Sequence, residues 1–207
     1  MAAPLSITKL KITTMANWAT TCYIIEAGAS VKNELKAIIE KMLRGEGVKQ
    51  EGSDPTWEGN VALALNESCN QKDYYLRGFV SEVNYDNKGN LNILADEAWS
   101  QTDFHKLLSK HYGEKIRVYW QCEEYNMGVY RTNDSEGKYF RDRFFVEVCI
   151  DNFNNSDYFT TKKDALDFVA MHTDCKTMED IEYFNENRMK AHPDDFIVFE
   201  EYKIIKT

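Results

Sequence analysis

The order of strand-like and helix-like segments in the first 126 residues is the strongest restriction on how this chain can fold. Residues 20–27 have the composition of a β-strand, and residues 30–45 carry apolar side chains at helical spacing. Residues 74–97 contain two strand-like runs around an Asp-Asn-Lys-Gly-Asn turn, which predicts a β-hairpin. A second amphipathic helix and the strand-like run 115–125 follow. This β-α-β-β-α-β order predicts an α+β fold of the ferredoxin-like type, with both helices on one face of an antiparallel sheet.

Local signals indicate where the two helices begin and end. Ser30 is a suitable N-cap for the first helix, and Gly45 is a suitable stop. Ser100 followed by Asp103 resembles a capping box for the second helix, although the usual residue is Glu or Gln. The run Val-Ala-Leu-Ala-Leu at 61–65 is a candidate for a short strand. The expected buried faces of the helices consist of Val31, Leu35, Ile38, Ile39, Met42 and Leu43 in the first, and Phe104, Leu107, Leu108 and Tyr112 in the second.

The C-terminal part follows a different pattern. Residues 128–132 and 138–150 flank a turn-forming Asp-Ser-Glu-Gly group, which predicts a hairpin with a long second strand. Short helices are expected at 161–173 and 177–189, because each begins with a threonine that is followed three residues later by an aspartate. We expect the final strand, 196–205, to pair with the long strand and the two helices to cover both. The whole chain then consists of an N-terminal extension (1–14), a ferredoxin-like domain (15–132) and a smaller α+β domain (133–207).

The cysteines and the hydropathy pattern indicate the cellular setting. The five cysteines are odd in number and contain no CxxC pair, which favours reduced thiols over a disulfide framework or a zinc ribbon. No apolar run approaches the roughly 18 residues that a membrane-spanning helix needs, and the N-terminus lacks the apolar segment of a signal peptide. We therefore expect a cytoplasmic protein with no membrane partner.

The charge distribution bears on the kind of partner. The net charge is −9; residues 51–100 contain three basic and nine acidic side chains, and residues 151–207 contain seven and thirteen. Nucleic-acid binding depends on lysine and arginine at phosphates, so this excess of acids disfavours it. An acidic surface attracts a basic protein surface, and it also keeps a protein in solution. A protein partner is therefore expected, and a homodimer formed through an unpaired edge strand is also compatible with the pattern.

No motif for a known reaction is present. The chain lacks a nucleophile elbow, a Walker loop and a GxGxxG segment, and its four histidines show no metal-ligand spacing, so we expect no cofactor and no metal. Acids at Asp96 and Glu97 precede a helix, where they favour its dipole. Glu123 and Glu124 alternate across a strand, so at most one of them faces any given site. Aromatic residues are enriched at interfaces, and the candidate interface consists of Trp99, Glu123, Glu124 and Tyr125.

One segment is partly similar to an RNA-binding motif. An RRM carries an aromatic stacking motif that begins Lys/Arg-Gly-Phe/Tyr on its third strand, and Arg77-Gly78-Phe79 would fall on the third strand here. The similarity ends after Phe79, because Val80, Ser81 and Glu82 replace the expected continuation. Arg77 and Phe79 are the candidate nucleic-acid-binding residues, and an ordinary half-buried strand is the alternative.

Short motifs in order resemble a family of small uncharacterised proteins of phages, plasmids and other bacterial mobile elements, which have ferredoxin-like domains. The motifs are Met-Ala-Asn-Trp at 15–18, Ala-Trp-Ser at 98–100 and Cys-Glu-Glu-Tyr-Asn-Met-Gly-Val-Tyr at 122–130. Two features depart from the family pattern: fourteen residues precede Met15, and Ala19 follows the tryptophan where a cysteine is common. The resemblance implies a fold and a mobile-element setting, and it implies no known activity.

These observations lead to three hypotheses about function. The first is a non-enzymatic binding or accessory protein of a mobile element that contacts a host or competitor protein; one version is an inhibitor of a defence protein. The second is binding of RNA or single-stranded DNA around Arg77 and Phe79. The third is an enzyme whose site is assembled from scattered acids and histidines.

Overall fold

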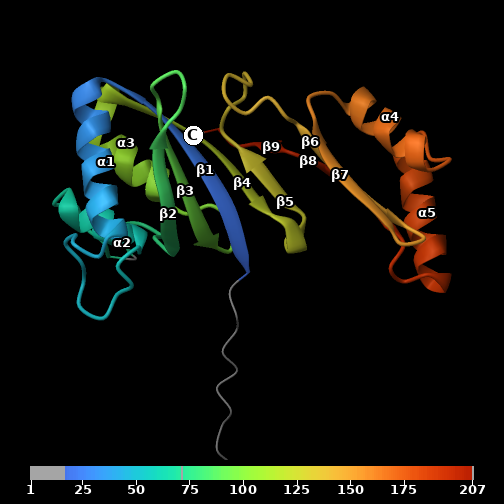
Figure 1. Ribbon diagram of the computed structural model, residues 1–207, viewed down its shortest axis with the longest axis horizontal. Helices are drawn as coiled ribbons and strands as arrows, with labels where there is room; N and C mark the ends of the chain where they lie inside the picture. Colours follow the sequence, from blue (N-terminus) through green and yellow to red (C-terminus); the bar gives the residue numbers. More distant parts are fainter. Residues whose placement is uncertain (1–16, 71, 207) are drawn as a thin grey trace, which may run out of the picture.

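A computed structural model describes residues 17–70 and 72–206 of the chain (Figure 1). It is 33% helix and 33% strand with antiparallel-rich sheets, which confirms the predicted α+β class. The predicted N-terminal extension, residues 1–14, lies outside the described residues. Within the described part, no helix combines the length and the apolar character needed to cross a membrane.

The first sheet has six strands in the order β2-β3-β1-β4-β5-β9. Neighbouring strands are antiparallel, except that β5 and β9 are parallel. Because β1 lies between β3 and β4, each of the two main helical connections passes over one strand before the chain rejoins the sheet. The strands are β1 (Trp18–Ala27), β2 (Gly78–Tyr85), β3 (Leu91–Ala98), β4 (Ile116–Glu124), β5 (Val129–Thr132) and β9 (Lys203–Ile204).

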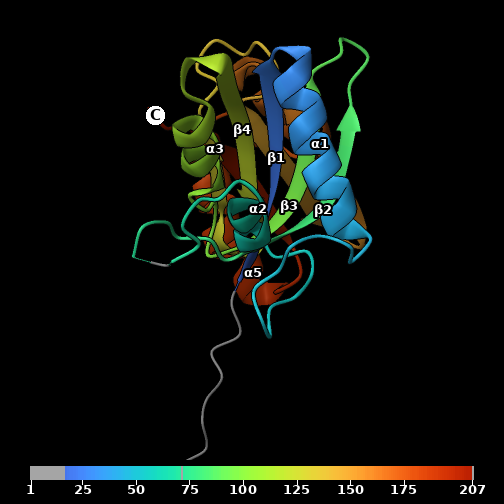
Figure 2. The same ribbon diagram turned by 90° about the vertical axis from the view of Figure 1, so that its left-hand side faces the viewer.

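Three helices cover one face of this sheet, as the sequence predicted for two of them (Figure 2). They are α1 (Ala29–Leu43), α2 (Glu58–Ala64) and α3 (Phe104–Tyr112), and two short 3₁₀ turns, η1 (Gly113–Lys115) and η2 (Tyr125–Met127), follow α3 and β4. All four apolar residues predicted for the second helix are buried, and Leu35, Ile39 and Met42 are buried on the first. They pack against Tyr23 and Ile25 of β1 to form the main core. Helical periodicity therefore identified the packed faces correctly.

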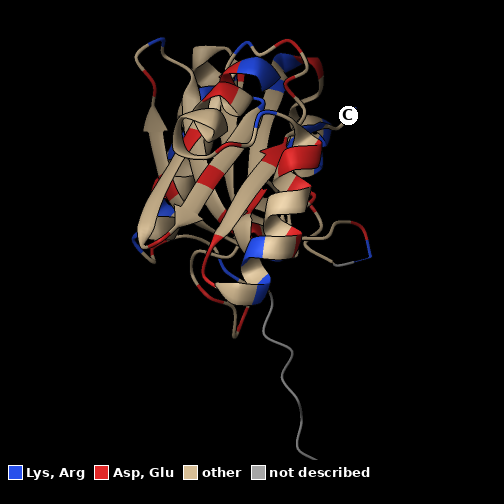
Figure 3. Ribbon diagram, turned by 90° about the vertical axis from the view of Figure 1, so that its right-hand side faces the viewer, with Lys and Arg blue, Asp and Glu red and all other residues tan. Residues whose placement is uncertain are grey.

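The second sheet has three antiparallel strands in the order β7-β6-β8. These strands are β6 (Phe144–Ile150), β7 (Phe153–Phe159) and β8 (Phe196–Glu201), and α4 (Lys162–His172) and α5 (Met178–Ala191) cover one face. The predicted threonine caps are confirmed: the side chain of Thr161 accepts from Asp164 N, and Thr177 with Asp180 forms a capping box. Acidic and basic residues are interspersed along the helices on this side of the molecule (Figure 3).

Three sequence predictions for the first sheet and its helices are wrong. The N-cap of α1 is Gly28 and not Ser30, which lies in the first turn of the helix. Residues 61–64 belong to α2 and Leu65 is its C-cap; a short apolar run of this kind does not distinguish helix from strand. The second main helix begins at Phe104 with Asp103 as N-cap, so Ser100 is not its cap. Ser100 instead lies in a left-handed turn with φ 75°, where its hydroxyl accepts a hydrogen bond from Arg131.

The predicted C-terminal hairpin is also wrong. β5 pairs with β4 and β9, whereas β6 pairs with β7 and β8, so the turn after Thr132 carries the chain from one sheet to the other. The long strand predicted at 138–150 is ordered as strand only from Phe144, because Asp134 accepts backbone hydrogen bonds from residues 138–140 and holds them in a loop. The polar strand β7 was not predicted. Pairing of the last strand with β6 is confirmed for Phe196–Glu201, but the predicted strand 196–205 breaks after Glu201 and its end pairs with β5 as β9.

The two sheets turn their helix-free faces toward each other, with helices on the outer sides of both (Figure 1). The predicted domain boundary after residue 132 falls between the sheets, but β9 returns from the second unit and pairs with β5 of the first. The helix-free face of the first sheet, formed by β1, β2, β3 and β4, is therefore turned toward the second sheet.

Candidate protein-binding face

Strand register places a polar row across the helix-free face of the first sheet. Glu123 of β4 lies opposite Thr20 of β1, Thr20 lies opposite Asp96 of β3, and Asp96 lies opposite Phe79 of β2. Residues directly opposite one another in a sheet share a face, so these four side chains form one continuous row. The next row consists of Gln121, Cys22, Leu94 and Glu82. We call these eight residues the open face.

The open face contains three acidic residues, Glu82, Asp96 and Glu123. Burial, together with the negative charges of Glu123 and Glu82, raises the pKa of the Cys22 thiol to about 11. Asp96 is exposed and accepts a hydrogen bond from Thr20 Oγ1 at 3.2 Å. None of the eight residues is basic. This arrangement attracts cationic groups and repels phosphates.

Aromatic side chains lie at the edge of the open face near the start of β1. Trp18 is 49% exposed, and its ring centre is 5.4 Å from that of Phe79. Trp99 is 45% exposed, and the Arg77 guanidinium lies 4.1 Å from its ring centre. Exposed tryptophans of this kind are typical of binding surfaces, where they provide a large contact area. The structure thus pairs the predicted residues Arg77 and Trp99, whereas Phe79 contacts Trp18.

Glu123 forms the opposite end of the open face, where the two sheets meet. It accepts hydrogen bonds from Tyr158 OH of β7 at 2.9 Å and from Tyr202 OH. Burial and the bond to Glu123 raise the pKa of Tyr202 far above its usual value, so this phenol remains a donor. Tyr130 of β5 stacks on Phe145 of β6 with ring centres 5.4 Å apart. This tyrosine junction holds the second sheet against the first.

The predicted interface residues do not form one surface. Glu123 lies in the tyrosine junction, and the hydroxyl of Tyr125, which is 47% exposed, bonds to Glu147 of β6. Glu124 is only 4% exposed on the other side of the strand, as strand alternation requires. Trp99 lies with Arg77 at the far edge. Sequence reasoning missed the role of Tyr158 and Tyr202, because a contact between residues this far apart leaves no local signal.

Asp96 and Glu97 also separate to opposite faces, and Glu97 takes part in a buried polar cluster. Both Glu97 and Glu58 of α2 are 0% exposed. Thr21 Oγ1 and Tyr23 OH donate to Glu97, and Thr102 Oγ1 lies 2.8 Å from Glu97 and 2.9 Å from Glu58. Burial and the charge of Glu97 raise the pKa of Glu58 well above its usual value. The two carboxyl groups therefore hold α2 against β1 and β3 from inside the core.

This cluster explains the glycine of the Arg77-Gly78-Phe79 segment. A Cβ atom at Gly78 would overlap the Glu58 carboxyl group, so glycine is required for close packing of α2 on β2. The segment also lies at the edge strand β2, which is the second strand of the chain, and its predicted placement on a third strand is wrong. The glycine thus has a packing role that is independent of nucleic acid.

Replacing Gly78 by alanine is expected to lower the free energy of unfolding by about 1–3 kcal/mol, because the added methyl group overpacks a rigid part of the core. The matched control is Gly28→Ala at the start of α1, where nothing lies within 4 Å of an added Cβ; we expect a change below about 1 kcal/mol there. Urea unfolding of both variants measures the difference. Equal stability of the two variants would show that the Glu58 carboxyl moves aside freely.

In comparisons with family models, curated proteins and solved structures, nothing matches this chain. Among the described residues, no group of three or more His, Cys, Asp or Glu side chains is arranged so that it could hold a metal ion. All five cysteines are free.

Proposed function

We propose that this chain is a binding protein that takes a basic surface of another protein against its open face. The observation that carries the proposal is the row Glu123, Thr20, Asp96 and Phe79, with Glu82 beside it and exposed Trp18 at its edge. The acidic groups provide attraction and orientation for lysine or arginine side chains, and the aromatic edge provides apolar contact area.

A non-enzymatic role agrees with the structural roles of Glu58, Glu97 and Glu123. Glu97 and Glu58 are enclosed in the core, and Glu123 is engaged by two tyrosines, so these carboxyl groups serve packing and joining of elements. The resemblance of the Met-Ala-Asn-Trp and Ala-Trp-Ser motifs to proteins of phages and plasmids is the support for a mobile-element setting. The proposed partner is accordingly a basic protein of the host or of a competing element, and inhibition of a defence protein is one form of this role.

Binding of single-stranded nucleic acid is the second candidate, because Trp18 and Phe79 form a ring pair on the same face and Arg77 is nearby. The charge pattern favours the protein partner. Asp96 of β3 lies directly opposite Phe79 of β2, and Glu82 follows Phe79 on β2. The phosphates of a nucleic acid bound at Phe79 would therefore approach two carboxylates.

The test is capture of partners from native cells by the tagged full-length chain, compared with a Glu82→Gln/Asp96→Asn variant. The control is Glu182→Gln/Glu186→Gln on α5, which removes the same charge from an exposed helix of the other unit. We expect one basic protein to be retained by the wild type and the control, and recovered at least tenfold less by the open-face variant. Equal recovery by all three, or recovery of nucleic acid alone, would contradict the proposal.

A further inference from the structure

A small pocket lies on the helix-free face of the first sheet, across β1, β2 and β3. Its volume is about 100 Å³, and it is lined by Cys22, Glu82, Asn84, Asn92 and Leu94. Strand register explains this set: three of the residues belong to one row of the open face, and Asn84 and Asn92 lie opposite each other in the next row. Small-molecule sites usually exceed roughly 300 Å³, so this pocket suits the end of a single side chain.

A β-bulge in β2 directs Glu82 into this pocket. The register between β2 and β3 shifts between Val80 and Glu82. In a regular strand Phe79 and Glu82, which are three positions apart, would point to opposite faces, and Glu82 would be directed toward the helices. The bulge adds one residue and places Glu82 on the same face as Phe79. The irregularity of β2 therefore supplies the only carboxylate that lines the pocket.

The polar groups of the pocket provide hydrogen-bond acceptors around this carboxylate. Glu82 accepts from the side-chain amide of Asn84 through Oε1, which leaves its second oxygen and the Asn84 carbonyl oxygen for another donor. Asn92 Oδ1 accepts from Cys22 Sγ at 3.2 Å and has a second lone pair. Burial and the neighbouring carboxylates raise the pKa of the Cys22 thiol to about 11, so the thiol remains a donor to Asn92.

The charge of Glu82 is not neutralised from within the described part of the chain. None of the ion pairs between described residues includes Glu82. A carboxylate with a free oxygen beside further acceptors favours a group that brings both positive charge and several N–H donors.

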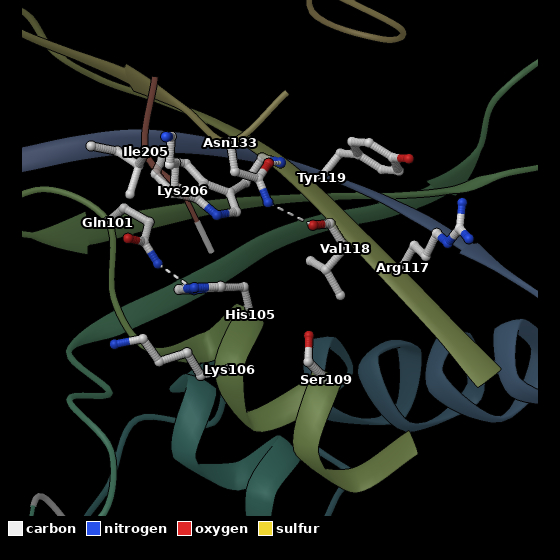
Figure 4. Close-up of a pocket in the computed structure, with 11 residues that line it drawn as sticks. Gln101, His105, Lys106, Ser109, Arg117, Val118, Tyr119, Asn133, Ile205 and Lys206 are labelled. Carbon is white, nitrogen blue, oxygen red and sulfur yellow. Dashed lines mark hydrogen bonds between the residues drawn. The ribbon is translucent and has the colours of Figure 1, made fainter. Parts of the chain in front are cut away.

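A larger pocket, between α3 and β4, does not bring its charged groups together in this way (Figure 4). Arg117 lies opposite Glu26 on the helix-free face of β4, whereas Lys106 belongs to α3 on the other side of the strand. Lys106 Nζ also lies 2.6 Å from Asp103 Oδ1. The smaller pocket is therefore the better defined of the two as a site for a charged group.

We propose that the small pocket receives the terminal ammonium group of a lysine side chain of the partner protein. This inference rests on the proposed function, because it names the group that the open face recognises. An ammonium group has three N–H donors, which match the Glu82 carboxylate and the carbonyl oxygens of Asn84 and Asn92. Leu94 contacts the methylene chain behind the ammonium group. A compact ammonium group fits this volume better than the wider, planar guanidinium of arginine.

NMR titration of the full-length chain with Nα-acetyl-lysine methylamide tests the proposal. The corresponding arginine, norleucine and Nε-acetyl-lysine compounds serve as comparisons at constant ionic strength. We expect saturable shifts of the side-chain amide signals of Asn84 and Asn92 with the lysine compound, weaker binding of the arginine compound, and no binding of the two uncharged compounds. Glu82→Gln should weaken binding of the lysine compound at least tenfold.

The matched control is Asp96→Asn, which removes one negative charge from the same face outside the pocket. It should leave the affinity within about twofold, and both variants should keep the wild-type unfolding midpoint within a few degrees. Absence of saturable shifts at millimolar concentrations of the lysine compound would overturn the proposal. Equal weakening by Asp96→Asn and Glu82→Gln would assign the binding to general charge attraction and would overturn it as well.

This test and the capture experiment fail independently. If a basic partner were captured but the lysine compound did not bind, the pocket assignment alone would be wrong. If the lysine compound bound in the pocket but no basic partner were captured, the proposed function would be contradicted, while the preference of the pocket for an ammonium group would stand.

Discussion

Replacing Glu97 by alanine is expected to lower the free energy of unfolding by about 3–5 kcal/mol, although an acid at a strand end is usually dispensable. The substitution removes the acceptor for the hydroxyls of Thr21 and Tyr23, which are buried with it. Thr102 loses one of its two carboxyl neighbours. Relief of Glu58 from a negatively charged neighbour offsets part of this loss, because that charge helps to raise the pKa of Glu58.

Asp96→Ala is the matched control for this prediction, since it removes a neighbouring acid of the same strand from the exposed face. We expect a change within about 0.5–1 kcal/mol, as is usual for an exposed side chain. Denaturant unfolding of the two variants under identical conditions gives the comparison. If Asp96→Ala cost as much as Glu97→Ala, the assignment of the two acids to opposite faces would be wrong.

Glu58→Gln is expected to change how stability depends on pH. Burial, and then the charge of Glu97, raises the pKa of Glu58 in the folded protein well above 4.5, so the folded state holds a proton that the unfolded state releases. The contribution of this group is therefore fully present below pH 4.5 and is lost as pH rises toward the raised pKa. The loss reaches at most about 1.4 kcal/mol per pH unit for one proton.

Glutamine keeps the shape of the protonated carboxyl group and does not titrate. The difference in unfolding free energy between Glu58→Gln and the wild type should consequently grow in favour of the variant between pH 4.5 and 8. Other carboxyl groups with lowered pKa values, such as Asp134 and Asp195, titrate in both proteins and cancel in the difference. Parallel stability curves for the two proteins over this pH range would refute a protonated Glu58.

Local sequence signals were sufficient for most of the elements but not for their pairing. Threonine caps at Thr161 and Thr177 and the apolar stripe of α3 depend on contacts within one helix, so they were readable from the sequence. The switch of the chain between sheets after Thr132 depends on Asp134, whose carboxylate binds the loop backbone. A turn of this kind and a hairpin turn have the same composition, which is why the pairing was predicted incorrectly.

At the candidate binding face, too, local signals were readable from the sequence and contacts between distant residues were not. Alternation along β4 was enough to separate Glu123 from Glu124, and the structure places them on opposite faces. The partners of Glu123 were not predictable, because Tyr158 comes from the second sheet and Tyr202 from the link between β8 and β9. The cluster of Glu58 and Glu97 also joins residues that are distant in the sequence, and α2 was taken for a strand. Which residues lie beside Glu97 and Glu123 depends on the register between neighbouring strands, and this register is fixed only in the folded sheet.

Carboxyl footprinting of the complex formed with the captured partner tests the central claim most directly. Surface carboxylates of the free chain and of the complex are labelled with a carbodiimide and an amine, and the extent of labelling is read by mass spectrometry. We expect labelling of Glu82 and Asp96 to fall in the complex, while labelling of Glu182 and Glu186 on α5 stays the same. Unchanged labelling of Glu82 and Asp96, or protection of the α5 acids instead, would contradict binding at the open face.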